Sequence, residues 1–313
     1  MADHREQGRW STCGLAGELA LLLEMQAATG CPPVLGLAPL LSSPQLTIVG
    51  LDEAGRGCVA GPVVAGATAW TLIQDSTWQT QPPTHRAATA ATSDNWKFMR
   101  DSKRLTAQRR EHAAALLTGK SKNLELVATA RNSALGKPVL RQCQHHLPAA
   151  AEASPEYLDK AFAWLAHRQI YDSSPLLGVG LASCSEIESL NIWEATQLAI
   201  GRALGLLYKV EGPAVVFFDG KLPCKLPEEF GQIPLVTLIK ADDKLRSVSA
   251  AGIVAKVTRD QMLTHMDQLF PEYGFAKHKG YGTAEHFAAI RARGVTPEHR
   301  TSFLSRIIEP TLF

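Results

Sequence analysis

Acidic residues at the ends of predicted strands could support metal-dependent chemistry in this chain. These residues are Asp52, Glu53, Asp219 and Asp242. Carboxylates that converge repel each other, so either their pKa values rise or cations bind between them. Oxygen-only ligands favour Mg²⁺ or Mn²⁺ over zinc. Two such ions about 4 Å apart can activate a water molecule and stabilise the leaving oxygen of a phosphodiester.

A glycine-rich turn directly follows the first pair of acids. Gly55-Arg56-Gly57 allows positive φ angles and lets backbone amides approach a ligand closely. Gly61-Pro62 then ends the turn before an apolar returning segment. Carboxylates beside such a turn suggest a divalent metal that faces a phosphate, and the alternative is a plain hairpin with solvated acids.

Asp52 and Glu53 present a geometric difficulty because they are adjacent. Neighbouring side chains on a regular strand point to opposite faces. The two carboxylates can therefore share a site only if the strand frays or bulges at this point. We expect such an irregularity at residues 52–53.

Apolar segments rich in β-branched residues predict the strands that position the acids. A continuous apolar run indicates a strand that is buried on both faces, as in an α/β sheet. Sites in open α/β sheets form where strand ends and loops converge. The predicted strands are Thr47–Leu51, Val63–Trp70, Leu124–Ala128, Leu176–Ala182, Ala214–Phe218 and Pro234–Ile239.

Capping signals and 3.6-residue periodicity predict the helices. Thr106 caps a helix that runs to about Leu117. A capping box, Ser185-Glu186-Ile187-Glu188, opens a helix to about Tyr208. Residues 248–313 are predicted to be mostly helical, with breaks at 271–274 and 279–282.

Composition divides the chain into an extension, a core and a helical end. Residues 1–46 contain a stretch rich in Pro, Gly and Ser, which predicts a loosely ordered N-terminal extension. Residues 47–240 form the predicted catalytic core, with insertions near 73–95 and 123–175. Residues 241–313 are expected to be a C-terminal helical part of the same domain.

Bulk properties exclude several classes of protein. The 313 residues are 45% apolar with a net charge of +2, which is ordinary for a globular protein and gives no global sign of nucleic-acid binding. A local basic run at 97–110 surrounds Asp101 and could bind phosphate, or could be a solvated face. The six cysteines have no metal-ligand spacing. With no signal peptide or membrane span, they predict reduced thiols and a cytoplasmic location.

Several motifs resemble those of type 2 ribonucleases H (ribonuclease HII), and they occur in the family order. Residues 50–57 with Gly61-Pro62 resemble the opening motif of that family. The other matching segments are Asp101–Leu105, Phe218–Gly220 with Leu226-Pro227, Lys240–Asp242, Ser249–Ala251, Ala255–Asp260, Phe270–Phe275 and His278–Thr283.

This resemblance implies an α/β fold, namely a ribonuclease H-like mixed β-sheet flanked by helices, with a C-terminal helical segment. It implies metal-dependent hydrolysis of the RNA strand of RNA–DNA hybrids, or at single ribonucleotides in duplex DNA, giving 5′-phosphate and 3′-hydroxyl ends. Two divalent ions, Mg²⁺ or Mn²⁺, are expected in the substrate complex. The implied catalytic metal ligands are Asp52, Glu53, Asp219 and Asp242.

The resemblance also implies which residues bind the substrate. Gly55, Arg56, Gly57 and Tyr281 would recognise the 2′-hydroxyl, the group that separates RNA from DNA at a single nucleotide. An alternative for Tyr281 is a buried aromatic that holds the last helices together. The further expected phosphate or structural contacts are Asp101, Ser102, Lys103 and Lys256.

The sequence departs from the family pattern in a few places. Gly252 stands within a predicted helix where the family usually has Ser. Asp243 beside Asp242 leaves two candidates for one ligand, and the motif register favours Asp242. The extension and the two insertions exceed a compact member of the family.

Other functions are also compatible with parts of the pattern. A type 3 ribonuclease H shares the carboxylates but has a folded N-terminal substrate-binding domain, for which 46 residues are too few. A catalytically silent nucleic-acid-binding subunit would be expected to lack one of the acids. We expect no requirement for a protein partner and a monomeric state. His145-His146 is expected at the surface, and Trp164 and Trp193 in the core.

Overall fold

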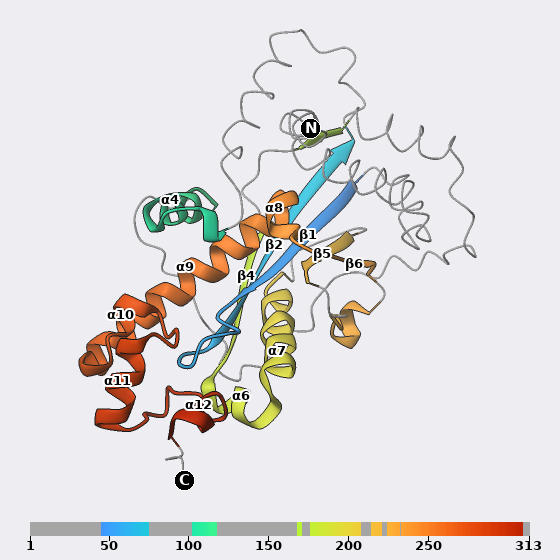
Figure 1. Ribbon diagram of the computed structural model, residues 1–313. Helices are drawn as coiled ribbons and strands as arrows, with labels where there is room; N and C mark the ends of the chain where they lie inside the picture. Colours follow the sequence, from blue (N-terminus) through green and yellow to red (C-terminus); the bar gives the residue numbers. More distant parts are fainter. Residues whose placement is uncertain are drawn as a thin grey trace, which may run out of the picture.

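A mixed β-sheet with helices on both faces forms the centre of the molecule (Figure 1). The computed structural model describes residues 45–74, 102–117, 168–170, 176–207, 214–220, 224–231 and 233–308. Within these ranges six strands pair in the order β3-β2-β1-β5-β6, and β4 also pairs with β2. The strands are β1 (Gln45–Ala54), β2 (Val63–Gln74), β3 (Arg168–Ile170), β4 (Leu176–Ala182), β5 (Ala214–Asp219) and β6 (Leu235–Leu238).

Strand β1 is central and has a different partner on each side. It pairs antiparallel with β2 along its whole length, through Ala54↔Val64. Its parallel pairing with β5 stops earlier, at Leu51↔Phe218. Among the described strands, the last three residues of β1 therefore have a neighbour on the β2 side and none on the β5 side. The strand begins at Gln45, so the predicted N-terminal extension of residues 1–46 is two residues too long.

Helices α9 (Arg246–Leu269) and α7 (Ile192–Gly205) cover opposite faces of the sheet (Figure 1). Ile48 of β1 belongs to the buried cluster that contains the α9 side chains, whereas the adjacent Val49 belongs to the cluster that contains the α7 side chains. This alternation is what a strand buried on both faces requires. The predicted α/β class is confirmed.

Helix α9 approaches the backbone of β1 and β2 closely because both strands carry a glycine beneath it. A Cβ atom on Gly50 would lie 2.1 Å from the carbonyl carbon of Ser247, and one on Gly66 would lie 2.2 Å from the carbonyl oxygen of Ala251. Larger residues at these two positions would force the helix away. The glycines thus bring the N-terminal half of α9 next to the acidic end of β1.

The C-terminal helices pack against the end of α9 (Figure 1). Their buried contact centres on Leu263, Phe275, Ile290 and Leu304. Both predicted breaks are present, at Phe270–Gly274 and at Lys279–Thr283. These elements are η5 (Pro271–Tyr273), α10 (Phe275–His278), α11 (Ala284–Arg293) and α12 (Thr301–Ile308).

Short helical elements complete the description. Helix α4 (Ala107–Leu117) follows Thr106, whose hydroxyl accepts a hydrogen bond from the Arg109 amide, as the predicted cap requires. The others are η3 (Ser102–Arg104), α6 (Cys184–Leu190), η4 (Glu228–Phe230) and α8 (Ala241–Lys244). In the part of the chain that the structure describes, no helix has the length and hydropathy needed to cross a membrane.

The prediction of one helix from Ser185 to Tyr208 is wrong. Helices α6 and α7 are separate because Asn191 between them has φ 73° and ψ 165°, which no helix accommodates. The capping box lies two residues earlier than predicted, with Ser183 as the cap and Glu186 at its third position. Both segments have the same Ser-x-x-Glu spacing, and Glu188 instead accepts hydrogen bonds from residues of α12.

The predicted boundaries of the two insertions are wrong. Strand β2 continues to Gln74, and β3 pairs with it, so residues of both segments belong to the sheet. Several expectations lie outside the described residues: the extension before Gln45, the strand Leu124–Ala128, Asp101, His145-His146 and Trp164.

Candidate active site

Asp52, Asp219 and Asp242 lie on the α9 face of the sheet. Asp52 follows the alternation of β1 that places Ile48 on this face, and Asp219 follows that of Phe217 in β5. Asp242 is in the first turn of α8, which begins at the end of β6. An oxygen of Asp219 accepts a hydrogen bond of 2.7 Å from the Ala241 amide, which fixes α8 against the end of β5.

Glu53 starts from the other face of β1 and joins the same group of carboxylates. Of the two alternatives, a fray or a bulge, the described strand has no bulge, because β1 stays in regular register with β2 through Ala54. The predicted fray occurs on one side only, where β5 pairing has ended at Leu51. A glutamate side chain can reach round this unpaired edge. Its Oε1 forms a 3.1 Å ion pair with Nε of Arg56.

The four carboxylates share one electrostatic environment. Burial raises the pKa of Asp52 well above its usual range, and the charges of Glu53, Asp219 and Asp242 raise it further. Burial also raises the pKa of Glu53 to about 6, although the Arg56 guanidinium opposes this change. These carboxylates would be stabilised in their ionised form by a cation among them.

Asp242 and Asp243 differ in their surroundings. Asp242 is buried and its charge acts on both Asp52 and Glu53. Asp243 is partly exposed and accepts a hydrogen bond of 3.0 Å from Arg104 at the surface. The geometry therefore favours Asp242 as the fourth member of the group, as the motif register does.

Gly252 makes room for the Asp52 carboxylate. A Cβ atom on this residue of α9 would lie 2.2 Å from Oδ2 of Asp52. The position of the carboxylate in this chain therefore depends on the missing side chain. This contact gives a physical reason for the glycine that departs from the family pattern.

The glycine turn (residues 55–57) rests on the buried side chain of Arg259. Gly55 has φ +95°, and a Cβ atom there would lie 2.0 Å from Nε of Arg259. The guanidinium donates hydrogen bonds to three carbonyl oxygens, those of Pro62 (2.9 Å), Ala60 (2.9 Å) and Lys279 (2.8 Å). Arg259 thus joins the segment after the glycine turn to the segment that contains Tyr281.

A second buried arginine holds the same turn. Arg300 donates two hydrogen bonds to the Gly61 carbonyl oxygen and one, of 3.0 Å, to that of Arg56. No carboxylate accepts a hydrogen bond from Arg259 or Arg300 among the described residues. Sequence reasoning missed both arginines. The available signal was that Arg259 lies in the segment Ala255–Asp260, which resembles a motif of the family.

Tyr281 lies beside the turn with its ring partly exposed to solvent. The Gly280 carbonyl oxygen accepts hydrogen bonds from the amides of Val59 (2.9 Å) and Ala60 (3.2 Å). The Tyr281 side chain is 46% exposed, so the alternative of a buried core aromatic is wrong. Burial of the hydroxyl end and the nearby Cys58 raise the pKa of the phenol.

A chain of buried histidines supports the backbone at Tyr281. His299 Nδ1 accepts from the Thr296 amide (3.0 Å), so its Nε2 is the donor to His286 Nε2 (3.1 Å). His286 then donates from Nδ1 to the Tyr281 carbonyl oxygen (2.9 Å). Burial lowers the pKa of both histidines to about 4, and these hydrogen bonds require the neutral imidazoles.

The remaining predicted contacts lie around this centre. Lys256 forms a 2.7 Å ion pair with Asp260 and lies 5.6 Å from the centre of the Tyr281 ring. The charge of Lys103 partly opposes the rise in the pKa of Glu53. Ser102 is buried, and its carbonyl oxygen accepts a hydrogen bond from Arg110.

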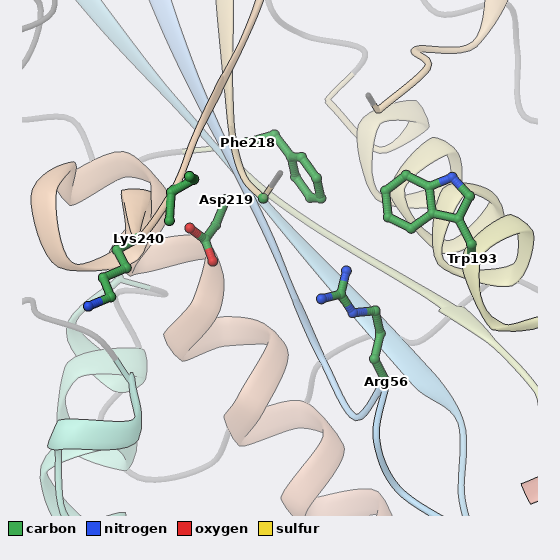
Figure 2. Close-up of a pocket in the computed structure, with 7 residues that line it drawn as sticks. Arg56, Trp193, Phe218, Asp219 and Lys240 are labelled. Atoms are coloured by element: carbon green, nitrogen blue, oxygen red, sulfur yellow. The ribbon is translucent and has the colours of Figure 1, made fainter. Parts of the chain in front are cut away.

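A cleft of about 290 Å³ opens beside Asp219 (Figure 2). Figure 2 shows the Arg56 guanidinium between Asp219 and the indole of Trp193. Trp193 packs partly against the core, and it also lines the cleft. The prediction of a purely core residue is therefore incomplete. The lining residues are Arg56, Trp193, Phe218, Asp219, Gly220, Ile239 and Lys240.

Comparison with known proteins identifies the family. The sequence profile named Ribonuclease HII matches residues 187–306. Ribonuclease HII of Geobacillus kaustophilus is 34% identical over 257 residues, which are 82% of this chain and 67% of that protein. Ribonuclease HII of Geobacter sulfurreducens is 33% identical over 82% of each chain. The chain belongs to the ribonuclease HII family.

Ribonuclease HII enzymes are endonucleases that hydrolyse phosphodiesters, and this chain is one of them. Ribonuclease HII of Psychromonas ingrahamii is 42% identical over 156 residues, which are 50% of this chain and 73% of that protein. Among solved structures, ribonuclease H2 from Pyrococcus horikoshii OT3 has a TM-score of 0.47 at 19% identity, covering 84% of this chain and all of that one.

The carboxylates of this ribonuclease HII fit a hard divalent cation in their chemistry. Within the described ranges, no group of three or more His, Cys, Asp or Glu side chains is already arranged as a metal site. Oε1 of Glu53 is held by Arg56 in a 3.1 Å ion pair. Oε2 of Glu53 is buried, and no group among the described residues donates a hydrogen bond to it. Such an atom needs a cation or a proton.

Proposed function

We propose that this chain cuts the RNA strand of RNA–DNA hybrids and cuts at single ribonucleotides within duplex DNA. The observation that supports the proposal is that four carboxylates interact electrostatically beside the glycine turn and a partly exposed Tyr281. The acids supply the hydrolytic chemistry, and the turn and the tyrosine supply groups that can distinguish ribose from deoxyribose. We further propose that the enzyme acts in the cytoplasm as a monomer, without an obligatory protein partner.

Asp52, Glu53, Asp219 and Asp242 would hold Mg²⁺ or Mn²⁺, with two ions in the substrate complex. Divalent ions bound there would supply Lewis acidity to the attacking water and to the leaving oxygen. Water adds to phosphorus as the bond from phosphorus to the 3′-oxygen breaks, and that oxygen takes a proton. The products carry 5′-phosphate and 3′-hydroxyl ends.

The protein's own groups would orient the phosphodiester. The amides of the glycine turn can donate to the 2′-hydroxyl from one side, and the Tyr281 hydroxyl can reach it from the other. A hydrogen bond alone contributes about 1–1.5 kcal/mol, or roughly tenfold discrimination. Greater discrimination requires that the same contact aligns the scissile phosphate with the acids. Ser102, Lys103 and Lys256 would contact neighbouring phosphates, and the motif that contains Asp101 suggests the same role for that residue.

The test is a cleavage assay on labelled duplexes with one ribonucleotide, with a full RNA strand and with DNA only. We expect cleavage of the first two, none of the third, and none of any with EDTA. Direct ligation of the two products would identify their ends as 5′-phosphate and 3′-hydroxyl. Cleavage of the all-DNA duplex at a similar rate, or cleavage that persists in EDTA, would contradict the proposal.

A further inference from the structure

The cleft beside Asp219 has the walls of a nucleotide-binding site. Trp193 provides an aromatic wall, and Ile239, which is 51% exposed, provides an apolar one. Arg56 and Lys240 add positive charge, and Figure 2 shows their side chains on opposite sides of Asp219. An aromatic wall in a cleft that also carries cationic side chains is a combination that proteins use to bind nucleic-acid strands without sequence preference.

Two strained backbone positions hold these walls in place. Asn191, directly before α7, has φ 73° and ψ 165°, a region otherwise adopted mainly by glycine. Its side chain accepts hydrogen bonds from the amides of Trp193 (2.9 Å) and Glu194 (3.1 Å) and so fixes the start of the helix that carries the indole. Lys240 on the other side is left-handed, with φ 58° and ψ 42°.

We propose that this cleft is a subsite for one nucleotide that flanks the cleaved bond, with its base stacked against the indole of Trp193 and its phosphate near Arg56. The proposal rests on the proposed function, because the cleft shares Asp219 with the catalytic group. A volume of about 290 Å³ is at the lower limit of ligand pockets, so it suits one nucleotide rather than a double helix. The positive charge of Arg56 and Lys240 matches a phosphate and not a cationic partner.

The test measures binding as a function of which nucleotides the duplex contains. An Asp52→Asn background keeps the labelled duplex uncut in Mg²⁺, and anisotropy gives the Kd. We expect Trp193→Leu to weaken binding of the full duplex by roughly 5- to 150-fold, the range for loss of a stacking aromatic, with Trp193→Phe intermediate. Leu190→Ala, which truncates an exposed side chain on α6, is the control and should bind as the parent does.

Truncated duplexes separate a subsite from a structural role. Nucleotides are removed from the cleaved strand on one side of the ribonucleotide, and in a second series on the other. In one of the two series, Trp193→Leu should no longer weaken binding once the nucleotide that occupies the cleft is missing. The Kd of the variant should then equal that of the parent. An equal penalty on every duplex, or no penalty on any, would overturn the proposal.

Two further measurements keep the test decisive. If Trp193→Leu does not fold, Ile239→Ser alters the other wall at an exposed position and should show the same dependence on truncation at a loss of a few fold. The otherwise unmodified protein is assayed for cleavage of the same full duplex. If it does not cut, the proposed function fails; if it cuts and Trp193 has no effect, only the subsite fails.

Discussion

Asp52 and Gly252 illustrate how a single missing side chain can determine the position of a proposed metal ligand. The carboxylate occupies the space that a Cβ atom on Gly252 would fill. Because Asp52 is a short side chain on a rigid strand, its position is sensitive to this neighbour. At position 252 the helix favours a residue with a side chain, whereas the position of the Asp52 carboxylate favours glycine.

Gly252→Ala should make the protein more stable and less active. Alanine is favoured over glycine in a helix interior by about 1 kcal/mol, and the carboxylate can rotate away at little cost. The rotation moves a proposed metal ligand, so we expect turnover to fall by at least tenfold while Tm stays equal or rises. Thermal melts and cleavage kinetics on the same samples check this. A variant with full activity would show that Asp52 tolerates the displacement.

The acidic group predicts how stability depends on pH and metal. The pKa of Glu53 is about 6 in the folded protein against an ordinary 4.5, so the folded state binds more protons in this interval. Without metal, stability should therefore fall as pH rises from 4.5 to 6, by about 2 kcal/mol from this group, and remain lower above it. The raised pKa of Asp52 acts in the same direction.

Mg²⁺ or Mn²⁺ should consequently raise Tm more at pH 8 than at pH 5. Asp52→Asn should raise Tm in EDTA at pH 8, abolish cleavage and reduce the response to metal, because it removes one of several clustered charges. Asp243→Asn is the matched control, since that residue pairs with Arg104 at the surface. An equal metal response at both pH values would argue against these acids as ligands.

The sequence identified the acidic residues but not their arrangement. Asp52, Asp219 and Asp242 could be predicted because each follows an apolar segment. The position of Glu53 could not, since it depends on β5 pairing ending at Leu51 while β2 pairing continues. Helical periodicity likewise predicts that Trp193 is a core residue. Only the three-dimensional structure shows that it also lines the cleft.

At the scale of elements, the glycine turn and the Tyr281 segment form a single unit. The Gly280 carbonyl oxygen accepts hydrogen bonds from the amides of Val59 and Ala60. Arg259 donates hydrogen bonds to carbonyl oxygens of both segments. Such contacts hold the proposed recognition groups in place before substrate arrives. Preorganisation of this kind reduces the entropy cost of aligning a substrate.

Arg259→Lys should reduce discrimination between ribose and deoxyribose through its effect on Tyr281. Lysine keeps the charge but cannot donate to three carbonyl oxygens in a fixed fork. We expect at least a tenfold lower ratio of cleavage on single-ribonucleotide duplex to cleavage on DNA. In a Tyr281→Ala background the same substitution should cost less, because only its effect through the glycine turn remains.

Arg202→Lys provides the comparison for this effect. Arg202 also combines a carbonyl contact, to Leu181, with a pairing to Glu186, but it lies on α7 away from Tyr281. Arg202→Lys should lower Tm without changing the ratio of cleavage on single-ribonucleotide duplex to cleavage on DNA. Additive losses for Arg259→Lys and Tyr281→Ala would show that the two residues act independently.

Helix boundaries were the least predictable elements. The Ser-x-x-Glu spacing occurs twice in succession, and the position of α12 decides between them, because Glu188 bonds to Thr301 and Ser302. A contact between residues so far apart in the chain cannot be predicted from local spacing. In contrast, the breaks near Pro271 and Gly280 were predicted correctly, since proline and glycine act locally.

At the scale of the whole molecule, the start of β1 determines how much of the chain precedes the sheet. Leu46 is fully buried in the cluster on the α9 face. A variant lacking residues 1–40 should therefore keep its cleavage rate and Tm. A variant lacking residues 1–46 loses Leu46, whose burial is worth about 1.5–3 kcal/mol, and should melt several degrees lower. Loss of activity in the shorter deletion, with Tm unchanged, would show that the extension takes part in the reaction.

The parallel pairing of β1 with β5 has a consequence for the order of events during synthesis. Residue 47 pairs with residue 214, and the carboxylates near residue 52 meet their partners at 219 and 242. Contacts between such distant positions form late and slowly, because a long loop must close first. The nascent chain thus leaves the ribosome tunnel with its first acids long before their partners exist. A ribosome stalled within the first two hundred codons would carry a nuclease that cannot cut.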